Sequence, residues 1–250
     1  MIQTLKSLDL RTRILLIALC AALVACLVMM TVAPARSALV FQSDDYVAEI
    51  QQTHIGVTLT ENGEDVGATG QLLRDDQAAR EYLLFNESTQ EVDEFMQPGQ
   101  VYREAISVKN VSDDMDEYVR LTVRKYWAEG ENGQATKSTA LNPGLIELVF
   151  DDVSAEKWVL SEEESNDERL VFYYKTVLPK GEHAAEPAIT GIRVSEDIKN
   201  VKQDYSNCYL ALSAQVDSVQ VRNAVDAAKS AWGVDVTKFA DQGLDWSYEG

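Results

Sequence analysis

The chain has 250 residues, of which 46% are hydrophobic, and a formal net charge of −19 at neutral pH. This acidity excludes proteins that bind the phosphate backbone, so we expect no nucleic-acid partner. The hydrophobic fraction is sufficient for a folded core and argues against a largely disordered chain.

The first 35 residues are typical of an export leader. A basic stretch from Lys6 to Arg13 precedes an uncharged run over residues 14–33. Ala33 and Ala35 then place small residues at the −3 and −1 positions of a cleavage site. The leader predicts a secreted or cell-surface protein. Because about 20 apolar residues can also span a bilayer, an uncleaved membrane anchor remains an alternative.

Processing after Ala35 would leave about 215 residues, with 19 basic residues against 40 acidic ones and a net charge of −21. Cys20 and Cys26 lie in the leader, so Cys208 would be alone in the mature chain. No intramolecular disulfide could form, and the fold would rely on its core. Such an exported chain suits a bacterial surface. Lipidation at Cys26 is a further alternative, although the apolar run continues past this residue.

Short segments of alternating apolar and polar residues dominate the mature chain, as in half-buried β-strands. Turn residues and acidic connections separate them. The predicted strands cover residues 55–60, 101–108, 118–127, 145–150, 157–160, 169–178, 188–194 and 208–220. This pattern predicts a mainly β, jelly-roll-like antiparallel sandwich that forms one domain over residues 36–250.

Two segments have helical rather than strand spacing. Residues 71–85, within an insert at about 71–95, carry apolar residues on one helical face. Residues 218–232 also carry apolar residues on one helical face, and Gly233 follows where a helix would end. We expect two accessory helices whose apolar faces pack against the sheets.

Several motifs occur in an order that resembles the TasA/camelysin family of Gram-positive bacteria, and the match covers most of residues 14–233. Gly56, Val57, Leu59 and Glu61 resemble the family's first strand and turn. The remaining matching motifs are Pro98-Gly99, Val108-Lys109-Asn110, Tyr118-Val119-Arg120, Trp158, Phe172-Tyr173-Tyr174-Lys175, Leu178-Pro179-Lys180-Gly181-Glu182, Ala214-Gln215 and Ala231-Trp232-Gly233. The insert at 71–95 departs from the family pattern.

The resemblance implies a jelly-roll protein exported through a SipW-type alternative signal peptidase and displayed outside the cell. TasA-like members form biofilm-matrix fibres in which the N-terminal strand of one subunit completes a sheet of the next, so the partners would be copies of this chain or a sibling fibre subunit. The donor-strand residues would be Leu39, Val40, Phe41, Tyr46 and Val47. The alternative is that the same strand folds back into its own sheet, because both arrangements use the same residues.

The resemblance also implies an alternative function, that of a secreted metallopeptidase, since camelysin has been described as one. The mature chain has only two histidines, His54 and His183, without an H-E-x-x-H motif, whereas a zinc hydrolase needs about three protein ligands. Cys208 lies in an apolar alternation and is expected to be a core residue. We therefore expect no catalytic site, no metal site and no cofactor.

Two acidic runs could hold divalent cations loosely. Asp113, Asp114, Asp116 and Glu117 form one, and Glu162–Glu164 form the other, but neither has the spacing of a calcium loop. The favoured interpretation is that both runs are charged turn residues exposed to solvent. The sequence thus predicts a structural subunit or accessory of an extracellular fibre or surface layer, with a metallopeptidase and a non-polymerising adhesion module as alternatives.

Overall fold

The computed structural model describes residues 56–72, 84–86, 91–93, 95–129, 136–205 and 208–247. The chain divides into two compact units, residues 1–53 and 54–250, and every described residue belongs to the second. The predicted leader and the predicted donor strand lie outside the described residues. None of the described helices is long and apolar enough to cross a membrane.

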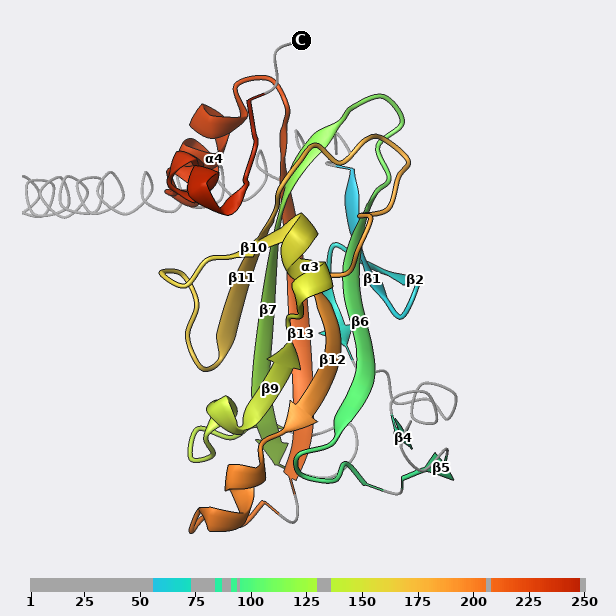
Figure 1. Ribbon diagram of the computed structural model, residues 1–250, viewed down its shortest axis with the longest axis vertical. Coiled ribbons are helices and arrows are strands. Elements are labelled where there is room, and N and C mark those ends of the chain that lie inside the picture. The colour runs from blue at the N-terminus through green and yellow to red at the C-terminus, as the bar shows by residue number, and fades with distance from the viewer. Residues whose placement is uncertain are drawn as a thin grey trace, which may run out of the picture. The chain divides into compact units, whose positions relative to one another are not determined.

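The described part of the second unit is an antiparallel β-sandwich (Figure 1). A five-stranded sheet has the order β2-β1-β6-β12-β9. Its strands are β1 (Val57–Glu61), β2 (Glu64–Gly67), β6 (Val101–Asn110), β9 (Ile146–Val149) and β12 (Ile189–Val194).

The second sheet has the order β10-β11-β7-β13-β3, with β8 pairing to β7 off this path. Its strands are β3 (Thr69–Leu72), β7 (Glu117–Glu129), β8 (Thr136–Lys137), β10 (Trp158–Leu160), β11 (Arg169–Tyr174) and β13 (Cys208–Gln220). The chain changes sheets on either side of β3, between β6 and β7, and on either side of both β9 and β12. A separate hairpin joins β4 (Phe85–Asn86) and β5 (Glu91–Val92). The predicted mainly β, antiparallel sandwich is confirmed.

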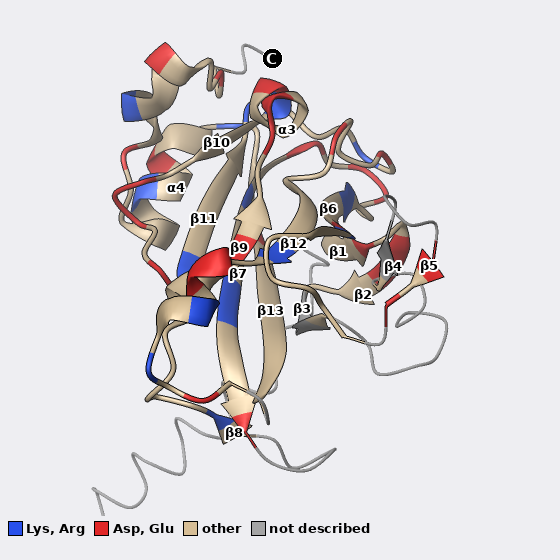
Figure 2. Cartoon of the chain, turned by 60° about the horizontal axis from the view of Figure 1, so that its bottom comes forward, with Lys and Arg blue, Asp and Glu red and all other residues tan. Residues whose placement is uncertain are grey.

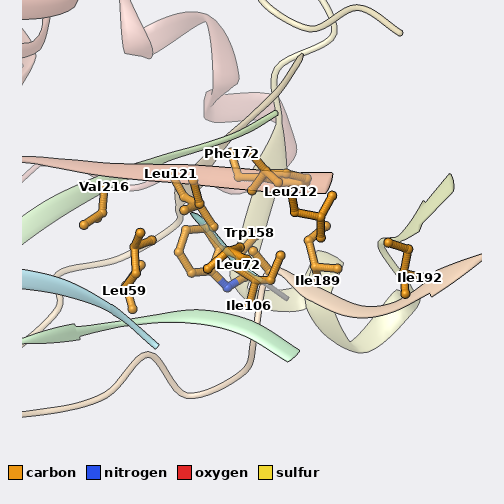
Figure 3. Packing of buried hydrophobic residues seen from close by; sticks show 14 of the residues in the cluster. Leu59, Leu72, Ile106, Leu121, Trp158, Phe172, Ile189, Ile192, Leu212 and Val216 are labelled. Atoms are coloured by element: carbon orange, nitrogen blue, oxygen red, sulfur yellow. The ribbon is translucent and has the colours of Figure 1, made fainter. Parts of the chain in front are cut away.

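The main core fills the space between the two sheets. Trp158 and Phe172 pack there against aliphatic side chains from both sheets, as Figure 3 shows. On β7, Val119, Leu121 and Val123 face this core because alternate residues of a strand point to the same side. These are the residues that the sequence pattern places on the apolar face of this strand.

A second core covers the outer face of the six-stranded sheet at one end. It is formed by the C-terminal cap, residues 224–247, which contains α4 (Ala224–Trp232) and the 3-10 helix η4 (Val236–Gln242). Figures 1 and 2 both place α4 beside β11. The cap buries Tyr118, Val159, Val171, Tyr173 and Val219 of the sheet against Ala224, Ala228, Val234, Val236, Phe239, Leu244 and Trp246.

The predicted helix over residues 218–232 begins too early. β13 stays paired with β7 as far as Gln220, opposite Glu117, so residues 218–220 are strand and α4 begins only at Ala224. The end of the helix is as predicted, because Gly233 adopts a left-handed conformation with φ 71° and its N–H binds the carbonyl of Lys229.

Two further differences concern the lengths of elements. The strand predicted over 169–178 ends at Tyr174, and Leu178 instead forms an isolated bridge with Glu117. Only the ends of the predicted helical segment 71–85 are described, and there Leu72 belongs to β3 and Phe85 to β4. The remaining short helices are η2 (Pro143–Leu145), α3 (Asp152–Lys157) and η3 (Glu196–Asn200).

Candidate assembly edge

The described chain enters the sandwich at Gly56, which is held by a buried carboxylate. The amide of Gly56 donates to Oε1 of Glu117 at 3.0 Å, and Glu117 is only 2% exposed. The carbonyl of Gly56 accepts from the amides of Val111 and Ser112. Glu117 is the first residue of β7 and lies opposite Gln220, the last residue of β13. The segment that precedes Gly56 therefore reaches the sandwich at the end where β13 stops.

β13 presents an incomplete edge at this end. Its 13 residues pair with β7 along their whole length, but on the other side β3 pairs only with Leu212–Gln215. The amide of Val216 adds one bond to the carbonyl of Ala68. Beyond it, no described strand pairs with the outer edge of Asp217–Gln220. Backbone N–H and C=O groups on such an edge can pair with an added strand.

The other sheet edges are short. β10 has three residues and β9 has four. β2 carries the charged residues Glu64 and Asp65, and Asp65 pairs with Lys109 at 3.5 Å. Short, charged edge strands are the usual protection against unwanted pairing. The open part of β13 is thus the edge best suited to accept another strand.

The predicted donor residues Leu39, Val40, Phe41, Tyr46 and Val47 lie outside the described residues, as do the cleavage-site residues Ala33 and Ala35. Their pairing stays a prediction. Eight residues, 48–55, separate Val47 from Gly56 and could span at most about 29 Å. That length permits either a return to β13 of the same chain or donation to a neighbour.

Of the histidines and the cysteine that were weighed as possible ligands, the two in the described part of the chain lie apart. His183 is exposed and forms an isolated bridge with Lys109, while His54 lies outside the described residues. Cys208 is half-buried at the start of β13 and packs beside the main core. Among the described residues, no three His, Cys, Asp or Glu side chains are grouped to hold a metal ion.

The first acidic run is divided between solvent and core. Asp113 and Asp114 are exposed, and Asp116 accepts a hydrogen bond from the amide of Lys180 at 2.9 Å. Glu117 does not join them, because its side chain points into the sandwich and holds Gly56. Figure 2 shows Asp and Glu positions mainly on the connections around the sheets.

The second acidic run supports the C-terminal cap. Glu163 forms an ion pair with Lys238 of η4 at 2.6 Å. Oε2 of Glu164 accepts hydrogen bonds from Ser161 at 2.9 Å and from Tyr173 at 2.8 Å. Burial of Tyr173, followed by this bond to Glu164, raises its phenolic pKa. Only Glu162 of this run is both exposed and without a described side-chain contact.

Sequence reasoning missed two buried carboxyl groups, Glu61 and Glu104, which are 3% and 1% exposed. Burial, followed by the charge of Glu61, raises the pKa of the Glu104 carboxyl to about 8. A signal was present in the sequence: Glu104 occupies the position between Tyr102 and Ile106 on the apolar face of its strand. Strict alternation would have placed it inside.

Comparison with known proteins finds no matching family model, no matching curated protein and no matching solved structure. The described residues define the class of protein: a mainly β sandwich in which no described strand completes the β13 edge at the end where Gly56 lies.

Proposed function

We propose that this protein is an exported structural protein, a subunit or accessory of an extracellular biofilm-matrix fibre or cell-surface layer. It assembles by donating the N-terminal strand of one copy to the sandwich of another copy or of a sibling subunit. The observation that carries the proposal is the edge of Asp217–Gln220, with which no described strand pairs and which lies at the end of the sandwich where Gly56 lies.

Strand donation explains why apolar residues follow the leader so closely. Leu39, Val40 and Phe41 would be exposed near the free end of a monomer. Paired with β13, their backbone groups would gain hydrogen-bond partners and their side chains would alternate between the core and the outer face. Tyr46 and Val47 would extend the same strand toward Gly56.

Export follows from the leader, with an alternative signal peptidase as the processing enzyme. An acidic surface fits an extracellular location, because self-repulsion keeps unassembled subunits apart until strand pairing overcomes it. The rigid sandwich would then serve as the repeating body of the assembly, and the N-terminal segment as its connector.

The proposal can be tested by electron microscopy of the secreted protein. We expect filaments from the processed protein and soluble monomers from a variant that lacks residues 36–48. A finer comparison uses Phe41→Lys, which places a charge on a donor residue, and Gln42→Lys as the neighbouring control. Only Phe41→Lys should abolish filaments, because burying an unpaired ammonium is costly. Filaments of the deletion variant would refute donation from this segment.

A further inference from the structure

Glu61 and Glu104 lie next to each other on the inner face of the five-stranded sheet. In the β1–β6 pairing, Glu61 is opposite Ile106, and Glu104 is two residues from Ile106 on the same face of β6. Such diagonal neighbours have their Cβ atoms within about 7–8 Å, so two glutamate side chains can meet. Both are almost fully buried.

The turn between β1 and β2 fixes this pair from one side. Asn62 adopts a left-handed conformation with φ 52°, and its Nδ2 donates to Oε2 of Glu104 at 3.3 Å. Its Oδ1 accepts from the amide of Ala105, and its own amide donates to the carbonyl of Ala105, both at 2.8 Å. Oε1 of Glu104 is buried and has no hydrogen-bond partner in the described part of the chain. A proton on the pair would supply a donor that this oxygen can use.

On β2, Glu64 lies opposite Glu61 and is exposed. Tyr102 precedes Glu104 on the same face of β6, and its hydroxyl donates to Asp93 at 2.6 Å, which together with burial keeps it protonated by raising its pKa to about 12. The strands β3 and β13 of the opposite sheet contribute the uncharged residues Leu72, Leu212 and Ala214 to the same core.

We propose that the buried carboxyl group of Glu104, beside Glu61, is a proton-binding site that holds β1 against β6 while it is protonated and releases β1 when it ionises. A second negative charge inside the sandwich would be desolvated and would repel the first, so ionisation favours states in which β1 separates from β6 and water reaches the pair. The β1–β2 hairpin is thus a pH-sensitive element, independent of how the protein assembles.

The direction of the pH effect follows from proton binding. The folded-state pKa of Glu104, about 8, lies above its ordinary value of 4.5, so the folded protein binds this proton more tightly than the unfolded chain does. The stabilisation is complete below about pH 4.5, declines as the pH rises, and is lost above about pH 8. Glu104→Gln keeps the shape and a hydrogen-bond donor but removes the titration.

The test uses protein purified after expression of the full chain, labelled with ¹³C at glutamate carboxyl carbons. We expect the Glu104 resonance to titrate with a midpoint above about pH 6.5. A Glu104 midpoint below that value overturns the proposal, and this measurement needs no variant to fold.

Hydrogen exchange then tests the release of β1. Corrected for intrinsic rates, amide protection over Val57–Glu61 should fall at least ~10-fold relative to Leu121–Val123 of β7 between pH 6 and pH 9. Glu104→Gln should remove this fall, whereas the exposed control Glu162→Gln should retain it. Loss of protection that is the same in wild type and Glu104→Gln would contradict the proposal.

Discussion

At the scale of single residues, the contact between Gly56 and Glu117 organises the start of the sandwich. Burying a carboxyl group costs free energy of folding unless hydrogen bonds replace its lost hydration, and Glu117 accepts such a bond from the amide of Gly56. Here the same glycine also pairs its carbonyl with the chain that follows β6. These hydrogen bonds fix the position of Gly56, the first described residue of the domain.

Gly56→Ala should therefore destabilise the fold. A Cβ at this position would overlap the backbone of Ser112, which cannot move as a flexible side chain can. We expect a loss of about 1–3 kcal/mol in the free energy of unfolding. Urea denaturation measures it, with Gly144→Ala as a control, since the nearest atom there belongs to the side chain of Asn142. Equal stability of wild type and Gly56→Ala would show that the contact is not tight.

Residue-level prediction succeeded where alternation was regular and failed where a polar residue occupied an apolar face. Val119, Leu121 and Val123 could be assigned to the core from period-two spacing alone. Glu104 has the same spacing, but a charged residue is normally expected on the solvent face, so it was not assigned to the core. The same spacing places Glu117 on the face of Val119, but no local pattern contains its partner, the amide of Gly56, which is 61 residues away in the sequence.

At the scale of elements, the C-terminal cap is held chiefly by aromatic contacts. Trp246 stacks on Tyr118 with ring centroids 4.8 Å apart, and its Nε1 donates to the carbonyl of Tyr174 at 2.9 Å. Trp232 lies beneath the guanidinium of Arg120, which also pairs with Asp217 at 2.9 Å. The outer face of β7 is therefore buried at one end although its pattern includes arginine.

Trp246→Ala should loosen this cap, because it removes the stacked ring and leaves the Tyr174 carbonyl without its donor. The expected loss is about 3–5 kcal/mol, the usual cost of truncating a buried tryptophan. Tyr209→Ala is the control, because Tyr209 is 45% exposed and its loss should cost less than about 0.5 kcal/mol. Similar costs for both variants in chemical denaturation would contradict this account of the cap.

Element boundaries could be predicted where local signals end them. Gly233 closes α4 as expected because a left-handed residue is needed there. The start of α4 could not be predicted, since residues 218–220 fit both a helix and a strand. Their pairing with Glu117–Val119 of β7, a tertiary interaction, decides in favour of the strand.

At the scale of the whole molecule, the excess of acidic residues opposes self-association. A chain cut after Ala35 would carry a net charge of −21, so its copies would repel each other at neutral pH, and salt would screen this repulsion. The solvated carboxylates of the connecting loops contribute to the charge without forming a described metal site.

Lowering the pH toward 5 should therefore promote assembly, because protonating carboxylates reduces the repulsion between subunits. We expect light scattering by the processed protein to rise sharply on acidification and, more weakly, on addition of salt. A variant without residues 36–48 is the control and should stay monomeric under the same conditions. Scattering that rises equally in both proteins would indicate nonspecific aggregation rather than strand donation.

The architecture as a whole was predictable because regular alternation and turn signals recur along most of the chain. The candidate edge was not, since it arises from a mismatch in length between β13, with 13 residues, and β3, with four. Only the pairing register reveals that the last residues of β13 extend past their neighbour.

The central claim, strand exchange between copies, is tested most directly by disulfide trapping in a Cys208→Ser background. One protein carries Phe41→Cys, or in separate variants Leu39→Cys or Val47→Cys, and the other carries Gln220→Cys. After mixing and mild oxidation, donation predicts a covalent dimer that contains one chain of each kind. If the mixture gives no such dimer, while a chain carrying both cysteines closes an internal disulfide as a monomer, the strand folds into its own sheet and the claim is wrong.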